Sequence, residues 1–335
     1  MATLKHDMRH FSLSNISDND TRRSYARSID KFCSWLDDTE GKRLKMKDLK
    51  GKKLETVNAY SKYLQEQGYS SHTIHTYLAP ICKAFQLRMD QVDKPKRRSI
   101  DITRGRMDRA NLQGKREAQQ DKYARTVAFE KAVGIRRAEL RAVRLRDLQT
   151  DENGHFCVLV EKGKGGKRQL QRILPDCQQD VKDIFDAARA SGADPDTRLF
   201  TEKELQNHID YHGMRAALAR KAYNYYQKKI ENGEKETLKK ELVDRWNACH
   251  EKHYAIVLYP SGKYGPVDKK TGGAKTAHFC RELNKETDYC LRGDNLIKAR
   301  KDGAAGKYDR IALLCTSVFH LSHWRNDVTV SHYVL

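Results

Sequence analysis

The sequence lacks the features that would place it in a membrane or in an oxidising compartment. Only 38% of its 335 residues are hydrophobic and the mean hydropathy is −0.85, and it contains no unbroken apolar run of the ~18 residues that a membrane span needs. The first residues are charged and lack the apolar segment of a secretory signal. The eight cysteines include no CxxC pair, which favours reduced thiols over disulfides. We therefore expect a cytoplasmic protein that makes no membrane contact.

Positive charge is what the sequence has in excess. Lys and Arg number 65 against 45 Asp and Glu, which gives a formal charge of +20. Such an excess favours a polyanionic partner, nucleic acid before membrane. Residues 94–116, 136–146 and 162–172 together hold 16 of these excess charges. At about 150 residues per domain, the length predicts two domains.

The N-terminal part is predicted to be a small helical domain, residues 1–93. Apolar residues recur at helical spacing in residues 20–37 and again in 53–66 and 70–85, where Pro80 should bend the third helix. Residues 94–116 follow, with nine basic and two acidic side chains and no clear period. We interpret this segment as an interdomain linker that contacts the phosphate backbone of a nucleic acid.

The second predicted domain, residues 117–335, mixes helices with a short β-hairpin. Helical patterns cover 117–133, 178–190 and 210–231, and two β-rich runs flank a glycine-rich turn at 162–167. Residues 232–306 are polar and are expected to be rich in loops, with a strand at 254–260. The predicted fold class is mainly α with a small β-hairpin or sheet (α+β).

Two segments of this domain offer groups suited to a phosphodiester. Arg136 and Glu139 lie three positions apart after Gly134, so the carboxylate can hold the guanidinium in a fixed orientation toward phosphate oxygens. Lys164 lies in the turn GKGGKR, where it can donate a proton to a leaving alkoxide. That turn is not a phosphate-binding P-loop, because GxxxxGK[ST] is missing. Taken singly, the first segment is more typical of an ordinary surface Arg–Glu pair, and the second is equally compatible with a solvated turn.

Two further segments complete the set. His212 and Arg215 share one face at the start of a predicted helix, where both can reach one anion. Near the C-terminus, the segment 319–333 holds His323 and Tyr333. A lone tyrosine in such a place is usually a packing residue, so only the combination of the four segments carries a functional interpretation.

The four segments resemble, in order and character, the boxes of the tyrosine recombinase (phage integrase) family. GIRRAEL is similar to the family's first-arginine box, GKGGKR to its β-hairpin lysine, HGMR to its HxxR box and LSHWRNDVTVSHY to its last segment. The resemblance covers residues 117–335 as the catalytic domain. Residues 1–93 resemble, less specifically, the family's helical core-binding (SAM-like) domain.

The resemblance implies a reaction in which DNA strands are cleaved and rejoined. Tyr333 would attack the scissile phosphate and form a 3′-phosphotyrosine bond, while His212 takes the tyrosine proton or otherwise assists proton transfer. Lys164 would protonate the departing 5′ oxygen. Rejoining by a 5′-hydroxyl conserves the bond energy, so no cofactor is expected.

The same resemblance assigns the residues that stabilise the transition state. Arg136 and Arg215 would clamp the nonbridging phosphate oxygens, and His323 would hydrogen-bond one of them. Glu139 would support Arg136. Further DNA contacts are expected from six basic residues: Arg97, Arg98, Arg104, Arg106, Lys167 and Arg168.

The implied partner is double-stranded DNA carrying a specific recombination site. The protein would be a monomer in solution and a homotetramer on synapsed DNA, assisted by DNA-bending or directionality proteins. The resemblance also implies a prokaryotic, nucleoid-associated protein that integrates or excises a mobile element. Two alternatives remain at this stage: a DNA-relaxing enzyme similar to type IB topoisomerases, and a catalytically inactive DNA-binding protein.

Three features depart from the family pattern. The interval from Arg215 to His323 is 108 positions, so residues 225–305 are interpreted as an insertion, and Arg292 and Arg300 are alternatives to Arg215. Ala216 replaces the usual histidine after the box arginine. Only two residues follow Tyr333, so protomers are expected to contact one another through other elements.

Residues 225–305, the segment interpreted as an insertion, also contain cysteine and histidine side chains of the types that bind zinc. Their spacing matches no standard zinc finger, so no metal site is predicted. They are Cys249, His250, His253, His278, Cys280 and Cys290.

Overall fold

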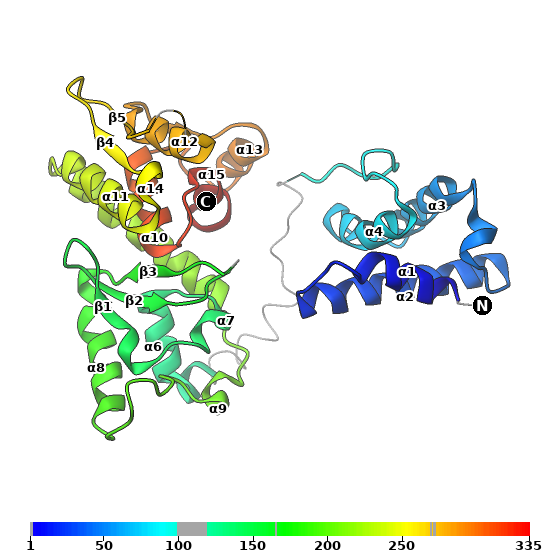
Figure 1. Ribbon diagram of the computed structural model, residues 1–335, viewed down its shortest axis with the longest axis horizontal. Helices are drawn as coiled ribbons and strands as arrows, with labels where there is room; N and C mark the ends of the chain where they lie inside the picture. Colours follow the sequence, from blue (N-terminus) through cyan, green and yellow to red (C-terminus); the bar gives the residue numbers. More distant parts are fainter. Residues whose placement is uncertain (1–2, 99–118, 165, 269, 271–272) are drawn as a thin grey trace. The chain divides into compact units, whose positions relative to one another are not determined.

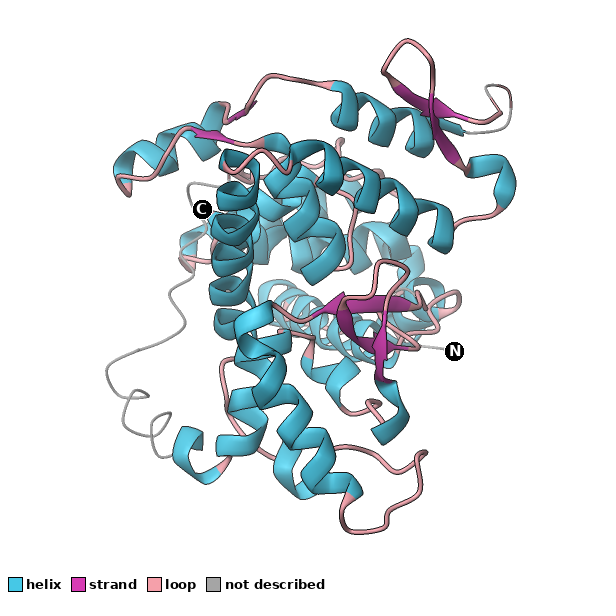
Figure 2. Cartoon of the chain, turned by 90° about the vertical axis from the view of Figure 1, so that its left-hand side faces the viewer, coloured by secondary structure: helices cyan, strands magenta, loops and turns pink. Residues whose placement is uncertain are grey.

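The computed structural model describes residues 3–98, 119–164, 166–268, 270 and 273–335, and it divides into two compact units, Met1–Arg104 and Gly105–Leu335 (Figure 1). Most of the predicted linker lies outside the described residues. Helices dominate the described chain, and the strands form small antiparallel sheets (Figure 2). The predicted fold class, mainly α with a small β component, is confirmed. None of the described helices combines the length and the apolar character that crossing a bilayer requires.

The described residues of the first unit, 3–98, form four helices and one 3₁₀ turn. They are α1 (Leu4–Leu13), α2 (Asn19–Glu40), the turn Met46–Leu49, α3 (Lys53–Glu66) and α4 (Ser71–Phe85). Three of the four begin at a residue whose side-chain oxygen accepts a backbone N–H: Thr3, Asp18 and Ser70. Such caps satisfy donors that the first helical turn leaves without partners.

The buried face of this unit follows the apolar spacing of its helices. Ile29, Phe32 and Leu36 of α2 pack with Tyr60 and Leu64 of α3 in one hydrophobic cluster. Pro80 lies inside α4, as the sequence predicts. The three helices expected from the sequence are therefore present, whereas α1, which precedes them, was not predicted.

The first half of the second unit places a three-stranded sheet between short helices. Its elements are α6 (Ala124–Val133), α7 (Arg137–Leu140), β1 (Leu148–Thr150), β2 (Phe156–Val160), β3 (Gln169–Arg172), α8 (Gln178–Arg189) and α9 (Glu202–Leu205). The strand order is β1-β2-β3, all antiparallel, with Val158 opposite Gln171. The turn between β2 and β3 is the predicted glycine-rich hairpin.

The second half is built on the long helix α10 (Tyr211–Glu231). It continues with α11 (Lys235–Cys249), β4 (Ile256–Leu258), β5 (Tyr264–Pro266), α12 (Gly273–Asn284), β6 (Tyr289–Cys290), α13 (Gly293–Lys301), β7 (Lys307–Tyr308) and α14 (Arg310–Cys315). A π-helical turn (Thr316–His320), α15 (Asn326–Thr329) and a second π-helical turn (Val330–Val334) end the chain.

The expectation that residues 232–306 are mostly loop is wrong. This segment contains α11, α12 and α13 as well as the predicted strand, which is shortened to β4. Helix α11 buries Leu238, Leu242 and Trp246 despite its many charged residues. Its Arg245 also donates to the fully buried carboxylate of Asp151 at 2.7 Å. The polar composition concealed these tertiary contacts, which tie the segment to the three-stranded sheet.

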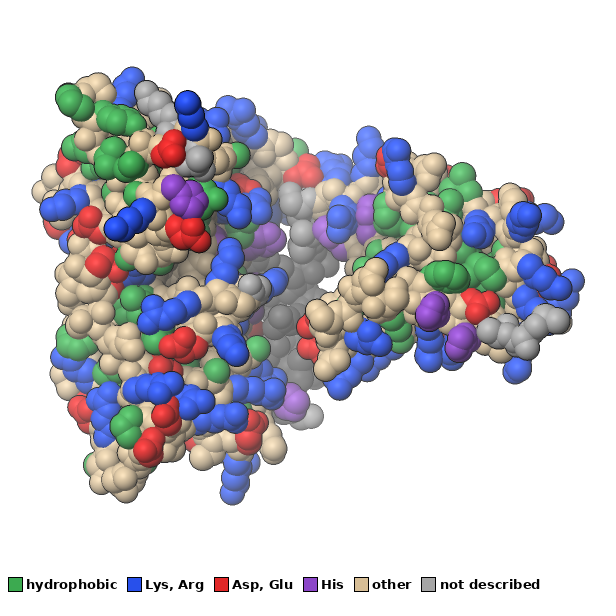
Figure 3. Space-filling model, in the orientation of Figure 1, with side chains coloured by type: hydrophobic (Ala, Val, Ile, Leu, Met, Phe, Trp, Pro, Cys, Tyr) green, Lys and Arg blue, Asp and Glu red, His purple; other side chains and the backbone are tan. Residues whose placement is uncertain are grey.

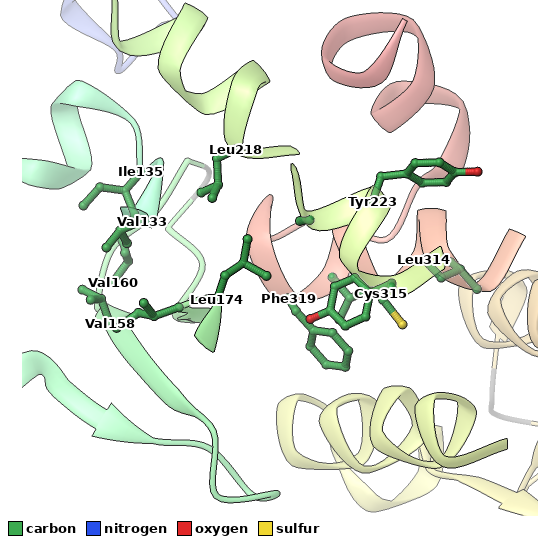
Figure 4. Packing of buried hydrophobic residues seen from close by; sticks show 14 of the residues in the cluster. Val133, Ile135, Val158, Val160, Leu174, Leu218, Tyr223, Leu314, Cys315 and Phe319 are labelled. Atoms are coloured by element: carbon green, nitrogen blue, oxygen red, sulfur yellow. The ribbon is translucent and has the colours of Figure 1, made fainter. Parts of the chain in front are cut away.

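One continuous core joins the two halves of the second unit. Figure 4 shows Val133 and Ile135 near Leu218 of α10, and Phe319 near Cys315. These residues belong to one cluster of buried side chains that runs from α6 and the sheet to α14. The core therefore fixes α10 against both the residues around Gly134 and the segment that precedes His323.

Candidate active site

The first part of the site starts at Gly134, the residue that ends α6. Gly134 has a left-handed conformation, with φ of +61°. A Cβ at this position would lie 2.8 Å from Cδ2 of Leu218 and 3.4 Å from the Cα of Arg215. Both the backbone angle and the close approach of α10 therefore require glycine. The close approach brings the arginine of α10 next to the box that holds Arg136.

Arg136 is the residue that precedes the short helix α7, and Glu139 fixes it there. The Glu139 carboxylate is 4% exposed and accepts a hydrogen bond from Arg136 Nη1 at 2.7 Å and another from the Arg136 backbone N–H at 3.1 Å. The Arg136 side chain stays 30% exposed. Its guanidinium is thus held in place by a buried carboxylate while one side remains open to a ligand.

The hairpin turn that carries Lys164 is attached to the same carboxylate. Glu139 Oε1 accepts a hydrogen bond from the Lys164 backbone N–H at 3.0 Å. The turn is closed by Gly163 N–H donating to the Lys167 carbonyl at 2.7 Å. Lys164, Lys167 and Arg168 are all exposed. Glu139 therefore links the arginine box to the lysine turn, with the ammonium group of Lys164 left in solvent.

Arg215 lies on the first turns of α10 and is 2% exposed. Its Nη1 donates to the Gly134 carbonyl and its Nη2 to the Leu321 carbonyl at 2.7 Å, whereas its buried Nε has no hydrogen-bond partner among the described residues. Burial, and then the charge of Arg136, lower the pKa of the Arg215 guanidinium. Two cations therefore lie close together in a desolvated site, with N–H donors still available for an anion.

Tyr333 lies in the last π-helical turn and is 8% exposed. Its ring centroid is 5.6 Å from that of His212, 6.0 Å from that of His323 and 5.6 Å from Cζ of Arg215. Tyr333 belongs to a small buried cluster with Ala216 and Ala219 of α10 and with Leu321.

His323 is held by Ser317, a residue that the sequence analysis missed. Ser317 Oγ donates its proton to the His323 carbonyl and lies 3.0 Å from Nδ1 of the imidazole. Because the hydroxyl has one proton, Nδ1 must be the donor in the second contact, which leaves Nε2 as the unprotonated nitrogen. Burial, followed by the charges of Arg215 and Arg136, lowers the pKa of His323 to about 3.

Trp324 is held by helices of the segment that the sequence analysis expected to be loop. Its ring lies 4.9 Å from that of Trp246 on α11 and 5.0 Å from that of Phe279 on α12, both edge to face. Trp324 follows His323 directly, so α11 and α12 support the loop that carries this histidine. No simple sequence signal identifies this support, because the aromatic residues are far apart in the chain.

Six of the seven predicted catalytic and supporting side chains lie together in the structure: Arg136, Glu139, His212, Arg215, His323 and Tyr333. The seventh residue, Lys164, contacts this group through its backbone N–H. The alternative arginines lie elsewhere: Arg292 precedes α13 and Arg300 lies near its end, and both are exposed. Arg97 and Arg98 are exposed in the first unit, and the predicted DNA contacts Arg104 and Arg106 lie outside the described residues. Figure 3 shows Lys and Arg side chains interspersed with acidic ones on the visible face of each unit.

No group of three or more His, Cys, Asp and Glu side chains suited to a metal ion occurs within the described part of the chain. The candidate site consists of two arginines, two histidines, a buried glutamate and a tyrosine. This set can bind an anionic, tetrahedral group and can move a proton to or from a phenol.

Comparison with known proteins gives matches only among solved structures. No family model and no curated protein matches this sequence. The chain is similar to the crystal structure of XerA recombinase, at 17% identity over 65% of this chain and 82% of that one, with a TM-score of 0.25. It is also similar to the Tn1549 transposon integrase (residues 82–397) in complex with circular intermediate DNA, at 14% identity over 99% of this chain and 95% of that one, with a TM-score of 0.42.

Proposed function

We propose that this chain is a tyrosine recombinase, a site-specific enzyme that cleaves and rejoins DNA through a 3′-phosphotyrosine intermediate. The observation that carries the proposal is the position of Tyr333 beside Arg215, His212 and His323. A tyrosine that only packs would need neither two histidines nor a desolvated arginine with an unused N–H donor. The order of the four boxes in the sequence supports the same conclusion.

In the first step, Tyr333 Oη attacks the scissile phosphorus and the bond from phosphorus to the 5′ oxygen breaks. The phenolic proton passes to a histidine, and Lys164 donates a proton to the departing 5′ oxygen, so the products are a phosphotyrosine and a 5′-hydroxyl. Strand transfer reverses these events with a 5′-hydroxyl from another strand. The bond energy is kept in the phosphotyrosine, so the reaction does not need ATP.

The arginines act on the charge that develops on the nonbridging oxygens. Arg215 has three N–H groups that are not used on the Gly134 and Leu321 carbonyls, and Arg136 is fixed by Glu139. Because both donors are oriented before DNA binds, they stabilise the transition state without reorganising. The negative charge of an incoming phosphodiester also offsets part of the repulsion between these two cations, which favours binding at this point in the site.

The tautomer of His323 bears on its role. With Nδ1 donating to Ser317, Nε2 offers a lone pair and not a proton. His323 therefore offers a second acceptor, besides His212, for the proton of Tyr333, and it can donate to a phosphate oxygen only once it has become protonated. A bound phosphate raises the affinity of this imidazole for a proton by opposing the two arginine charges.

The finer functional expectations follow from the same proposal. The partner is double-stranded DNA with a defined recombination site, and exchange between two sites requires four protomers on synapsed DNA. Integration or excision of a mobile element is the biological reaction that we propose. The basic residues 94–116 would follow the DNA backbone near the cleaved phosphate.

The test is covalent capture of DNA. A pool of nicked duplexes of randomised sequence is incubated with the protein, adducts that survive SDS are recovered, and the enriched duplex becomes the substrate. We expect an adduct with the wild type and none with Tyr333→Phe. Tyr225→Phe, which makes the same substitution on α10, is the control and should still form the adduct. An adduct that persists in Tyr333→Phe, or tight salt-dependent binding without an adduct in the wild type, would refute the proposal. Relaxation of supercoiled DNA without strand exchange would favour a topoisomerase.

A further inference from the structure

Gln171 is a fully buried polar residue on β3, the strand that returns from the Lys164 turn. Its side-chain nitrogen lies 2.8 Å from the Val133 carbonyl and 3.4 Å from the Gly134 carbonyl, and it also donates to the His320 carbonyl. Three surrounding carbonyls identify this atom as the amide nitrogen. A buried amide with several partners in two separate segments has a defined orientation.

The amide oxygen of Gln171 makes an equally specific contact. It accepts a hydrogen bond from Ser322 Oγ at 2.9 Å. Ser322 has a φ of +55°, a left-handed conformation that is strained for a residue other than glycine. Such a conformation persists where surrounding contacts hold it, and the bond to Gln171 is one of those contacts.

Both ends of this amide reach the groups that hold Arg215. The Gly134 carbonyl accepts from Arg215 Nη1, and the Leu321 carbonyl, which precedes Ser322, accepts from Arg215 Nη2. Gln171 therefore contacts the two backbone segments whose carbonyls orient the guanidinium. His323 follows Ser322 directly, so the same contact also reaches the loop of this histidine.

We infer that Gln171 is a positioning residue that orients Arg215 for phosphate binding and couples it to the strand of the lysine hairpin. The inference rests on the proposed function and deepens it. Without the amide, the Gly134 carbonyl and the Ser322 hydroxyl next to Leu321 lose their common partner, and the guanidinium loses its fixed direction. A catalytic group displaced by about 1 Å can cost about 100-fold in rate. DNA binding, which depends on many phosphate contacts, should change little.

The principal variant is Gln171→Leu, which is similar in size and removes both ends of the amide. We expect the rate of adduct formation at saturating substrate to fall about 100-fold, with the dissociation constant for DNA unchanged. Gln149→Leu makes the same change on β1 of the same sheet and should retain the wild-type rate. Gln171→Glu keeps the acceptor for Ser322 and loses the donor, so it should also be slow.

Two further measurements separate positioning of Arg215 from a general structural role. In an Arg215→Lys background, adding Gln171→Leu should cause no further loss, because both changes remove the same orientation. A substrate with sulfur in place of the bridging 5′ oxygen has a leaving group that needs no proton. With that substrate, the cleavage rate of Lys164→Ala should recover, whereas that of Gln171→Leu should stay low.

The inference is overturned if Gln171→Leu cleaves at the wild-type rate or if the sulfur substrate restores the cleavage rate of this variant. It is also overturned if the fold-losses in rate of Gln171→Leu and Arg215→Lys multiply in the double variant. Should Gln171→Leu fail to fold, Ser322→Ala tests the same contact, with a fall of about tenfold expected and a wild-type rate contradicting the inference. If the wild type forms no adduct at all, the proposed function fails and this inference fails with it. If the wild type and Gln171→Leu form the adduct at the same rate, this inference fails and the proposed function stands.

Discussion

Glu139 Oε1 accepts a hydrogen bond from the backbone N–H of Lys164 at 3.0 Å. The same oxygen accepts from Arg136 Nη1 at 2.7 Å, so one buried carboxylate connects the first arginine box with the lysine turn. The two boxes are separated in sequence but share this single acceptor. Loss of the carboxylate should therefore affect both phosphate binding and protonation of the leaving group.

The first prediction concerns this carboxylate. Glu139→Ala removes all three hydrogen bonds that this carboxylate accepts and should slow adduct formation about 100-fold, whereas Glu139→Gln keeps an acceptor oxygen and should slow it about tenfold. Glu161→Gln, an exposed change at the base of the same hairpin, is the control and should be neutral. Initial rates on the nicked substrate measure the effect. Equal rates in all four proteins would contradict the proposed link.

The second prediction decides between the candidate arginines. Arg215→Ala removes a preorganised donor set and should lower the cleavage rate about 100- to 1,000-fold. Arg292 is exposed where α13 begins, so Arg292→Ala should cleave normally. The rate is measured in single turnover with enzyme in excess. Loss of cleavage in Arg292→Ala with normal cleavage in Arg215→Ala would reverse the assignment.

The third prediction concerns the stability of the turn at Gly134. Gly134→Ala places a methyl group 2.8 Å from Leu218 Cδ2 on a backbone with φ of +61°. The free energy of unfolding should fall by about 2 to 4 kcal/mol, the combined cost of a left-handed alanine and of overpacking. Gly192→Ala has φ of +70° and open space, so it should cost only about 1 kcal/mol. Denaturant unfolding compares the two, and equal losses would show that the contact with α10 is not tight.

The fourth prediction is an acid sensitivity that arises from His320. Burial, and then the charge of Arg172, lower the pKa of this fully buried histidine from 6.5 to about 3. Below pH 6.5 the unfolded chain therefore binds a proton that the folded protein excludes, so stability falls as the pH drops from that value toward about 3. At pH 5 this difference amounts to about 2 kcal/mol.

His320→Gln removes this source of acid sensitivity. The free energy of unfolding of the variant should fall about 2 kcal/mol less than that of the wild type between pH 7 and pH 5. Urea unfolding at the two pH values measures the difference. His253→Gln, an exposed histidine, serves as control and should follow the wild type. Parallel pH dependence in wild type and His320→Gln would contradict the prediction.

Much of the helical framework could be predicted because its signal is local. The helix expected at 53–66 coincides with α3 (Lys53–Glu66), and the one expected at 210–231 nearly coincides with α10 (Tyr211–Glu231). In both, apolar residues recur at helical spacing and a polar face remains. The hairpin of β2 and β3 could also be predicted from the sequence, because a glycine-rich turn separates two β-rich runs.

The supporting contacts of the site could not be predicted, because they join residues distant in sequence. Ser322 and Gln171 are 151 positions apart, and nothing in the local sequence of either indicates the other. Ser317 is equally ordinary in sequence, although its hydroxyl determines the tautomer of His323. In α11, the charged residues that concealed the helix include Arg245, which pairs with a buried carboxylate of the sheet. Sequence patterns indicated the groups of the candidate site but not the contacts that orient them.

The central claim is that Tyr333 becomes joined to DNA, and peptide mapping of the adduct tests it most directly. Trypsin cleavage after Arg325 releases a peptide that begins at Asn326, and Tyr333 is the sole tyrosine among residues 326–335. We predict that nuclease-trimmed adduct yields this peptide carrying nucleotide through a 3′-phosphate on Tyr333, identified by fragmentation in the mass spectrometer. Nucleotide attached to any other residue, or to a 5′-phosphate, would contradict the account.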